Sequence, residues 1–200
     1  SALDDIGIAH AGAGRNSREA RGVGLLEVSG ETVALLPCTT VGPIAGPDQP
    51  GARSCRDSQL VPEIAALAGE AGVVIVFPHW GREYRTEPAD SQRHLARRWV
   101  AAGADLVLGA HSHWAGAIEE IDDRLVFYSM GDLTFDQPWS EATMQGLIVE
   151  LTFVDDRLVQ AWLHPTLIVE DVQPNLLEFD AGGSKVLKRM RDASADLLGY

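Results

Sequence analysis

The stretch VVIVFPHWGREYRTEPADSQRHLARRWVAAGADLVLGAHSH, residues 73–113, decides the fold of this chain. Two short apolar runs, at 73–77 and 105–109, have the length and composition of buried strands. The segment between them, residues 90–102, repeats apolar side chains at the spacing of an amphipathic helix. The stretch therefore predicts a strand, a helix and a second strand, and a crossover of this length makes the two strands parallel.

Three histidines follow the two predicted strands. His79 comes after the first strand, and His111 and His113 come after the second. Because ligands of parallel sheets gather at the carboxyl ends of the strands, we expect all three imidazoles at one edge. Neutral imidazole is a common metal ligand, so the pattern favours part of a metal site. The alternative is that each histidine only satisfies polar groups of its own loop.

Composition limits the classes of function. The chain has 200 residues, 46% of them apolar, which suits one globular domain over residues 1–200. Its 16 basic and 29 acidic residues give a formal net charge of −13, which argues against nucleic acid as a partner. An anionic substrate would have to be met locally, and Arg82 and Arg85 are the obvious cations after His79. The alternative is that both arginines are solvated loop charges.

Cys38 and Cys55 are the only cysteines, and they flank a stretch rich in glycine and proline. Two cysteines that close a flexible loop fit a disulfide in an oxidising compartment. Two free thiols in a reduced protein fit the sequence equally well. The sequence leaves the pairing open.

The remaining segments place α/β structure first and antiparallel strands later. The arginines of the central helix, Arg93, Arg97 and Arg98, are expected on its solvated face. Turns are expected at 29–30, 122–123 and 155–156. The further strands are expected at residues 22–28, 31–36, 117–121, 124–128, 146–153 and 157–164, and the further helices near 58–72 and at 184–198.

Linked segments give the chain a recognisable pattern. They are FPHWGREY at 77–84, AGADLVLGAHSH at 102–113 and FYSMGDLTFDQ at 127–137, followed by PWSEATMQGL at 138–147. In this order and at these separations, the segments resemble the bacterial capsule synthesis protein family, the CapA or poly-γ-glutamate synthesis type. The resemblance extends over essentially the whole chain.

The resemblance implies a fold and a site. The fold is α/β, a metallophosphoesterase-like αββα sandwich with its metal site at strand ends. His79 and His111 match ligands of one divalent ion (Mn, Fe or Zn), and His113 matches a ligand of the neighbouring ion. Glu83 matches a family signature and is expected to act with His79 in catalysis, as an acid, a base or a substrate-orienting carboxylate. The residues expected to bind substrate are Trp80, Arg82 and Arg85.

Two departures from the family pattern alter the expected site. Ala110 stands where the family usually has a further histidine, and Asp132 stands where it usually has asparagine, which brings an additional carboxylate close to the metals. The family's N-terminal motifs, which supply aspartate and asparagine ligands, have no counterpart here, so the chain resembles the C-terminal two-thirds of the domain. Three imidazoles lack the bridging charge that two cations need. We therefore expect this chain alone to bind one metal weakly and to turn over little.

The resemblance also implies a function and a location. The function is that of a metal-dependent hydrolase or transferase in capsule or poly-γ-glutamate biosynthesis, and the location is extracytoplasmic, at the cell envelope. The expected partners are an anionic polymer or a phosphorylated small substrate, with membrane synthase subunits. Two alternatives are a non-catalytic envelope scaffold for a polymer synthase or exporter, and a general metallophosphoesterase acting on a small phosphorylated metabolite.

Overall fold

The chain forms two compact units. The computed structural model describes residues 3–154, 157–170 and 172–197. One unit contains the described residues up to His79 together with Arg98–Val107, and the other contains Trp80–Arg97 and the described residues from Leu108 onward. The single domain predicted over residues 1–200 stays a prediction.

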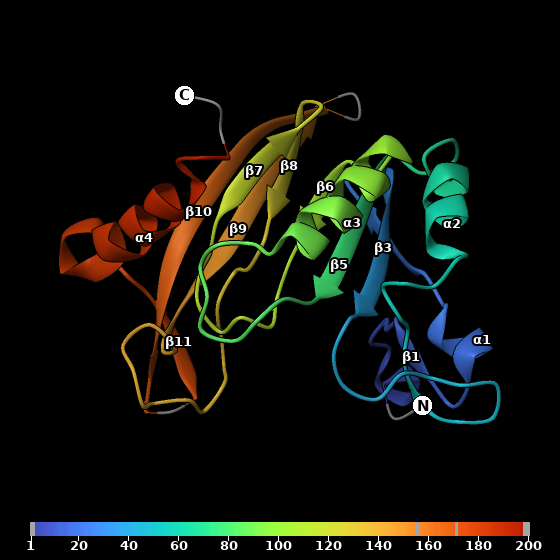
Figure 1. The fold of residues 1–200 in the computed structure, drawn as a ribbon, viewed down its shortest axis with the longest axis horizontal. Helices are drawn as coiled ribbons and strands as arrows, with labels where there is room; N and C mark the ends of the chain where they lie inside the picture. Colours follow the sequence, from blue (N-terminus) through green and yellow to red (C-terminus); the bar gives the residue numbers. More distant parts are fainter. Residues whose placement is uncertain (1–2, 155–156, 171, 198–200) are drawn as a thin grey trace. The chain divides into compact units, whose positions relative to one another are not determined.

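The first unit is built on strands in the order β2-β3-β5-β6. Figure 1 labels β3, β5 and β6 of this series. β2 (Gly24–Val28) and β3 (Glu31–Thr39) form the predicted hairpin, and both turn residues have the positive φ that a tight two-residue turn requires. β5 (Val73–His79) lies parallel to β3, and β6 (Leu106–Leu108) lies parallel to β5. The parallel pairing of β5 with β6 confirms the predicted crossover.

The predicted helices of the N-terminal half form with shifted ends. α3 (Asp90–Ala101) ends one residue before the prediction, and its Trp99 is buried. α2 (Leu60–Leu67) is shorter than expected, with Pro62 in its first turn, where a missing N–H costs no hydrogen bond. The smaller elements are η1 (Asp4–Ile6), β1 (Ala13–Gly14), α1 (Ser17–Ala20) and β4 (Gly51–Ala52).

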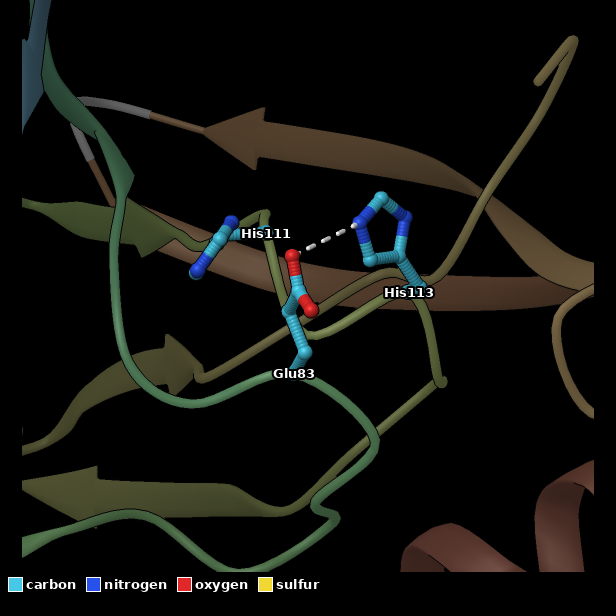
Figure 2. A group of neighbouring side chains, drawn as sticks. All are labelled: Glu83, His111 and His113. Carbon is cyan, nitrogen blue, oxygen red and sulfur yellow. Dashed lines mark ion pairs between the residues drawn. The ribbon is translucent and has the colours of Figure 1, made fainter. Parts of the chain in front are cut away.

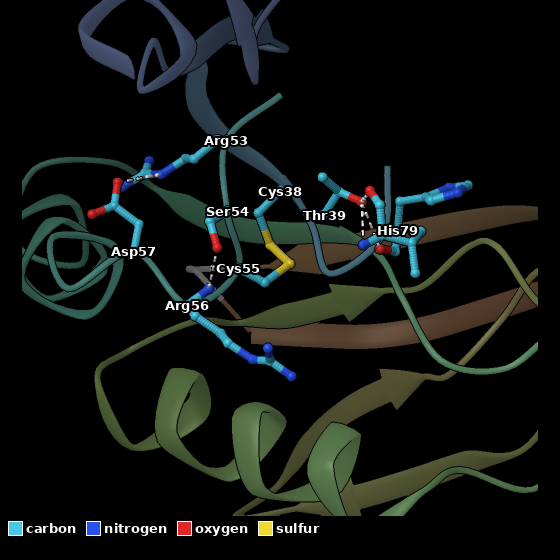
Figure 3. The surroundings of a disulfide bond; sticks show 9 residues. Cys38, Thr39, Arg53, Ser54, Cys55, Arg56, Asp57 and His79 are labelled. Carbon is cyan, nitrogen blue, oxygen red and sulfur yellow. Dashed lines mark hydrogen bonds and ion pairs between the residues drawn. A yellow bond between two sulfur atoms is a disulfide. The ribbon is translucent and has the colours of Figure 1, made fainter. Parts of the chain in front are cut away.

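A disulfide joins Cys38 in β3 to Cys55, and both cysteines are buried (Figure 3). Next to Cys38 in the chain, the Thr39 N–H donates to the Arg53 carbonyl at 2.8 Å, and the Thr39 carbonyl accepts from the Cys55 N–H at 2.9 Å. The Thr39 hydroxyl donates to the His79 carbonyl at 3.1 Å. Of the two alternatives that the sequence left open, the structure contains the disulfide, and the bond lies next to the residue that supports the end of β5.

The second unit contains a hairpin and a three-stranded antiparallel sheet in the order β11-β10-β9. The turn predicted at 155–156 lies outside the described residues. The strands are β7 (Ile118–Ile121) and β8 (Arg124–Phe127) in the hairpin, and β9 (Gln145–Val154), β10 (Arg157–Val169) and β11 (Gln173–Leu176) in the sheet.

β10 is longer than the sequence predicted, and β11 was not predicted. The expected strand stopped at residue 164, immediately before Pro165. In the structure β10 continues through Pro165, which pairs with Leu147 of β9, and its carbonyl accepts from the Leu177 N–H at 2.8 Å. The proline thus keeps its acceptor role in the sheet, and proline is tolerated where its N–H is not required.

α4 (Ser184–Ser194) packs its apolar face into the core of the second unit. It follows a π-helical turn, η2 (Phe179–Gly183), and realises most of the predicted helix at 184–198. None of the helices among the described residues is long and apolar enough to cross a membrane. The core cluster consists of Ala115, Leu147, Val186 and Met190, with Ile118, Met130, Val149, Leu163 and Leu187 packed against it.

The arrangement confirms the predicted fold class. Parallel strand–helix–strand structure comes first, and antiparallel strands follow, in a mixed α/β chain. This organisation is consistent with the expected metallophosphoesterase-like sandwich.

A buried carboxylate in the second unit corrects one prediction. Glu119 of β7 is 4% exposed and receives three hydrogen bonds from Arg93, the shortest at 2.7 Å, and one from Arg97 at 3.5 Å. The Tyr128 hydroxyl donates to Glu119 at 2.5 Å. The prediction that Arg93 lies on the solvated face of α3 is therefore wrong, because its guanidinium is 29% exposed and pairs with this buried carboxylate. Arg97 and Arg98 are exposed, as predicted.

Removal of the disulfide should lower the stability of the chain. The bond closes a loop with a sequence separation of 17, and loop entropy predicts a loss of about 3 kcal/mol in the free energy of unfolding when Cys38 and Cys55 are both changed to serine. Urea unfolding of the wild type with and without a reductant measures the same effect. The double variant is the control, because the reductant should leave its midpoint unchanged; a wild-type midpoint that ignores the reductant contradicts the prediction.

Glu119→Gln should destabilise the protein in a pH-dependent way. Burial alone would raise the pKa of Glu119, but the hydrogen bonds from Arg93 and Tyr128 outweigh it and lower the pKa below 4.5. The stabilisation from this carboxylate is therefore complete above pH 4.5 and is lost as the pH falls through the lowered pKa. At pH 7 we expect a loss of about 3–5 kcal/mol in unfolding free energy.

The matched control for Glu119→Gln is Glu120→Gln, the exposed neighbour on the same strand. Chemical unfolding from pH 7 to pH 3 should show the difference between wild type and Glu119→Gln shrinking below pH 4.5. A difference that stays constant over this range would show that the lowered pKa is not its origin.

Candidate metal centre

Two loops of the second unit carry the candidate site. Residues 80–89 follow β5 in the chain, and residues 109–117 follow β6. The Trp80 N–H donates to the Ala110 carbonyl at 3.0 Å, and the Tyr84 N–H donates to the Ser112 carbonyl at 2.8 Å. These two backbone hydrogen bonds fix the loops side by side.

The two loops bring Glu83, His111 and His113 together. Each side chain offers one ligand atom, and these atoms all lie within 4.8 Å of one another. Glu83 Oε1 lies 4.0 Å from His113 Nε2. Figure 2 shows the Glu83 carboxylate directed toward the two imidazoles. The Glu83 side chain is 52% exposed and that of His113 only 12%, so the carboxylate forms the open side of the group.

The backbone of both histidines is in an unusual conformation. His111 has φ of 101° and His113 has φ of 61°, in the left-handed region that favours glycine. Such residues cost on the order of 1–3 kcal/mol each and persist where surrounding structure holds them. The first residue of this loop, Gly109, has to be glycine, because a Cβ there would lie 2.2 Å from the Tyr128 carbonyl oxygen. The loop thus accepts strain to turn both imidazoles toward Glu83, and such strain gathers at functional sites.

The donor set fits a divalent transition metal. Two imidazoles and one carboxylate form a common set for zinc and for non-haem iron. Bonds of 2.0–2.1 Å in a tetrahedral site place two ligand atoms about 3.4 Å apart, which is closer than the 4.8 Å spread of the group. Because Glu83 is exposed, rotation of its side chain is the simplest way to close that difference.

The electrostatics of His111 suit a ligand. Burial lowers the pKa of His111 below 6.5, against the attraction of the Glu83 carboxylate, and the neighbouring His113 lowers the pKa further. A lowered pKa keeps the imidazole neutral at neutral pH, and only neutral imidazole offers a lone pair to a metal.

His113 packs against several side chains. Asp132 lies with its carboxylate oxygens 3.0 and 3.1 Å from His113 Nδ1. Tyr84 and Phe135 stack on the imidazole with ring centroids 5.9 and 5.3 Å away. Burial raises the pKa of Asp132, although the hydrogen bond with His113 acts in the opposite direction. Asp132 therefore lies beside His113, where the sequence placed an additional carboxylate.

The other predicted site residues lie in different surroundings. His79 ends β5 in the first unit, where its carbonyl accepts from the Thr40 N–H at 3.0 Å; its role as a ligand stays a prediction. Trp80 is fully buried, stacks on Tyr128 and donates its indole N–H to the Tyr128 carbonyl at 3.0 Å. It supports the loop from inside. The guanidinium-bearing residues flanking Glu83 are exposed, as a role in substrate binding requires; they are Arg82 and Arg85.

Sequence reasoning missed the aromatic and amide groups around His113. Tyr84, Phe135 and Gln137 stood inside the quoted segments, but no spacing rule assigned them to the site. The Gln137 side-chain nitrogen lies 3.5 Å from His113 Nε2, and Gln137 is 8% exposed. Their convergence depends on the path of residues 128–137 after β8, which local periodicity does not specify.

Comparisons with known proteins point to one family. The family described as bacterial capsule synthesis protein PGA_cap matches residues 1–137. The capsule biosynthesis protein CapA of Bacillus anthracis is 32% identical over 154 residues, covering 74% of this chain and 38% of that protein. The PGA biosynthesis protein CapA of Bacillus subtilis is 37% identical over 125 residues, covering 61% of this chain and 33% of that protein.

A more distant relative carries a related description. A probable polyglutamine synthesis accessory protein of Mycobacterium tuberculosis is 28% identical over 152 residues, covering 68% of this chain and 40% of that protein. The chain thus spans well under half the length of these relatives.

The titration of His111 should reveal its buried surroundings. In the metal-free protein, the imidazole proton signals of His111 in NMR spectra should titrate with a midpoint below 6.5, because burial disfavours the imidazolium. Glu83→Gln should lower the midpoint further, since the Glu83 carboxylate favours the charged form. A midpoint at or above 6.5 in the wild type would contradict the burial that the structure shows.

Proposed function

Because the chain belongs to the bacterial capsule synthesis protein family, we propose that it is a metal-dependent hydrolase or transferase of capsule or poly-γ-glutamate biosynthesis. The observation that carries the proposal is the convergence of Glu83, His111 and His113, with ligand atoms within 4.8 Å of one another. The names of the relatives support a role in capsule or poly-γ-glutamate biosynthesis, and the two imidazoles and one carboxylate support metal-dependent chemistry.

His111 and His113 would hold the metal ion through neutral imidazole nitrogens, with Glu83 as the charged ligand. A divalent ion bound there supplies Lewis acidity to a substrate carbonyl or phosphoryl oxygen and lowers the pKa of water. The identity of the ion, Mn, Fe or Zn, is left to metal availability, since these donors accept all three. When Glu83 is not bound to the ion, its exposed carboxylate is placed to take or give a proton beside the two imidazoles.

Arg82 and Arg85 would bring the substrate to the site. Both are exposed on the loop that carries Glu83, in a chain whose formal net charge is −13. A polymer of carboxylates, or a phosphorylated small substrate, would be repelled by most of this surface and attracted by the two guanidinium groups. We assign Arg82 and Arg85 to substrate binding because of this attraction. Trp80 is fully buried and would support their loop from inside the protein.

The disulfide supports an extracytoplasmic location at the cell envelope. Disulfides persist in oxidising compartments and are rare in the bacterial cytoplasm. The Cys38–Cys55 bond is therefore the structural observation that favours this location, in agreement with the capsule biosynthesis names of the relatives. At the cell envelope, membrane synthase subunits would be the partners of this protein.

Metal binding should depend on the three converging side chains. We expect calorimetric titration of the full-length protein with Mn²⁺ or Zn²⁺ to show binding that weakens at least about tenfold in His111→Gln and in His113→Gln, because each removes one ligand. His94→Gln, an exposed histidine on α3, is the matched control and should bind like the wild type. Equal affinity in all these proteins would refute the proposed site.

The same variants separate the proposed function from its alternatives. Polymer output of a producing strain should fall with His113→Gln and not with His94→Gln. Unchanged output with lost metal binding would favour the non-catalytic envelope scaffold. Rapid turnover of a chromogenic phosphodiester by the manganese-loaded protein would favour a general metallophosphoesterase of small metabolites.

A further inference from the structure

We propose that Asp132 is a positioning residue for His113: it accepts the Nδ1–H proton and so leaves the Nε2 lone pair facing Glu83 and His111. The inference rests on the metal-binding role proposed for His113. Both Asp132 oxygens contact Nδ1, at 3.0 and 3.1 Å, and the two side chains are 11% and 12% exposed. The contact is therefore a specific pair within the protein and differs from a loose surface ion pair.

The chemistry of the pair fixes which nitrogen carries the proton. Neutral imidazole has one N–H donor and one acceptor nitrogen, whereas an ionised carboxylate only accepts. Placing the proton on Nε2 would set the Nδ1 lone pair against the oxygens of Asp132. With the proton on Nδ1, the nitrogen that faces Glu83 Oε1 at 4.0 Å is the one able to bind a metal.

Gln137 lies near the other ring nitrogen of His113. Its side-chain nitrogen is 3.5 Å from His113 Nε2, and which of the two groups donates follows from the tautomer of the ring. The contact with Asp132 therefore assigns the proton by itself. Gln137 is held in place from its own backbone, because its carbonyl accepts from the Thr143 hydroxyl at 2.5 Å.

The surrounding structure restricts the orientation of the His113 ring. The ring stacks on Tyr84 and Phe135, each with an interplanar angle of 29°, and the backbone φ of 61° restricts the direction in which the side chain leaves the chain. Asp132 is fixed as well, since the preceding Gly131 forms a bridge with Gly146. A carboxylate that orients a ligating histidine in this way commonly strengthens metal binding by 10–100-fold.

The first readout is the tautomer of His113 in the metal-free full-length protein. Two-dimensional ¹H–¹⁵N spectra of the imidazoles at pH 8 should show His113 protonated at Nδ1, with the signals assigned by their loss in His113→Gln. Asp132→Ala should shift the ring toward the Nε2–H form, and Asp132→Asn should retain much of the Nδ1–H form because an amide oxygen also accepts. A wild-type ring protonated at Nε2 would overturn the inference, whether or not the protein binds metal.

The second readout is the affinity for Zn²⁺ measured by calorimetry. Asp132→Ala should weaken binding by about 10–100-fold and Asp132→Asn by less, while circular dichroism confirms that both variants fold. Asp136→Asn removes a nearby exposed carboxylate and is the control for a general loss of charge. Equal weakening by Asp132→Ala and Asp136→Asn would overturn the positioning role. Absence of Zn²⁺ binding in the wild type would instead reject the proposed function, and the tautomer would still decide the role of Asp132.

Discussion

Two backbone hydrogen bonds between the loops after β5 and β6 are the constraint on which the candidate site depends. They join Trp80 to Ala110 and Tyr84 to Ser112, and Glu83 lies between their donors in sequence while His111 lies between their acceptors. The loops can therefore not slide past one another without losing both bonds. This fixed register holds His111 and His113 in their strained backbone conformations and keeps their imidazoles beside the Glu83 carboxylate.

The site is rigid on one side and open on the other. His113 is enclosed by Asp132, Tyr84 and Phe135, whereas Glu83 is more than half exposed. An incoming cation would thus meet a His113 imidazole whose direction is already set, and the adjustment would fall on the carboxylate. Ordering one exposed side chain costs less than reorganising a packed loop, which is why preorganised ligands favour binding.

Much of the fold follows from local patterns in the sequence. The parallel pair β5 and β6, α3 between them and the hairpin of β2 and β3 were all predictable, because strand length, helical periodicity and turn residues are local signals. β11 and the continuation of β10 past Pro165 were not, since both depend on a partner strand that is distant in sequence. Tertiary context decides such cases.

The sequence predicted part of the candidate site. Histidines at strand ends predicted His79, His111 and His113 as metal ligands, and of these His111 and His113 lie in one group with Glu83. The family resemblance singled out Glu83 as a catalytic residue and Asp132 as a nearby carboxylate, and it did not predict Glu83 as a ligand. The burial of Trp80 and the pairing of Arg93 with Glu119 went unforeseen, because a side chain's environment depends on which elements cover it. The local sequence around a tryptophan or an arginine does not show whether the side chain faces solvent or the core, because both side chains are amphipathic.

Because Cys38 and Cys55 form a disulfide, the folded fraction of the chain depends on whether these two thiols have been oxidised. Before oxidation the unfolding equilibrium is displaced by about 3 kcal/mol, so unfolded molecules are roughly a hundredfold more abundant. A newly made chain in a reducing environment is correspondingly more open to proteases and chaperones. Thiol oxidation therefore shifts the chain toward its folded state, and the bond forms next to Thr39, whose hydroxyl donates to the His79 carbonyl.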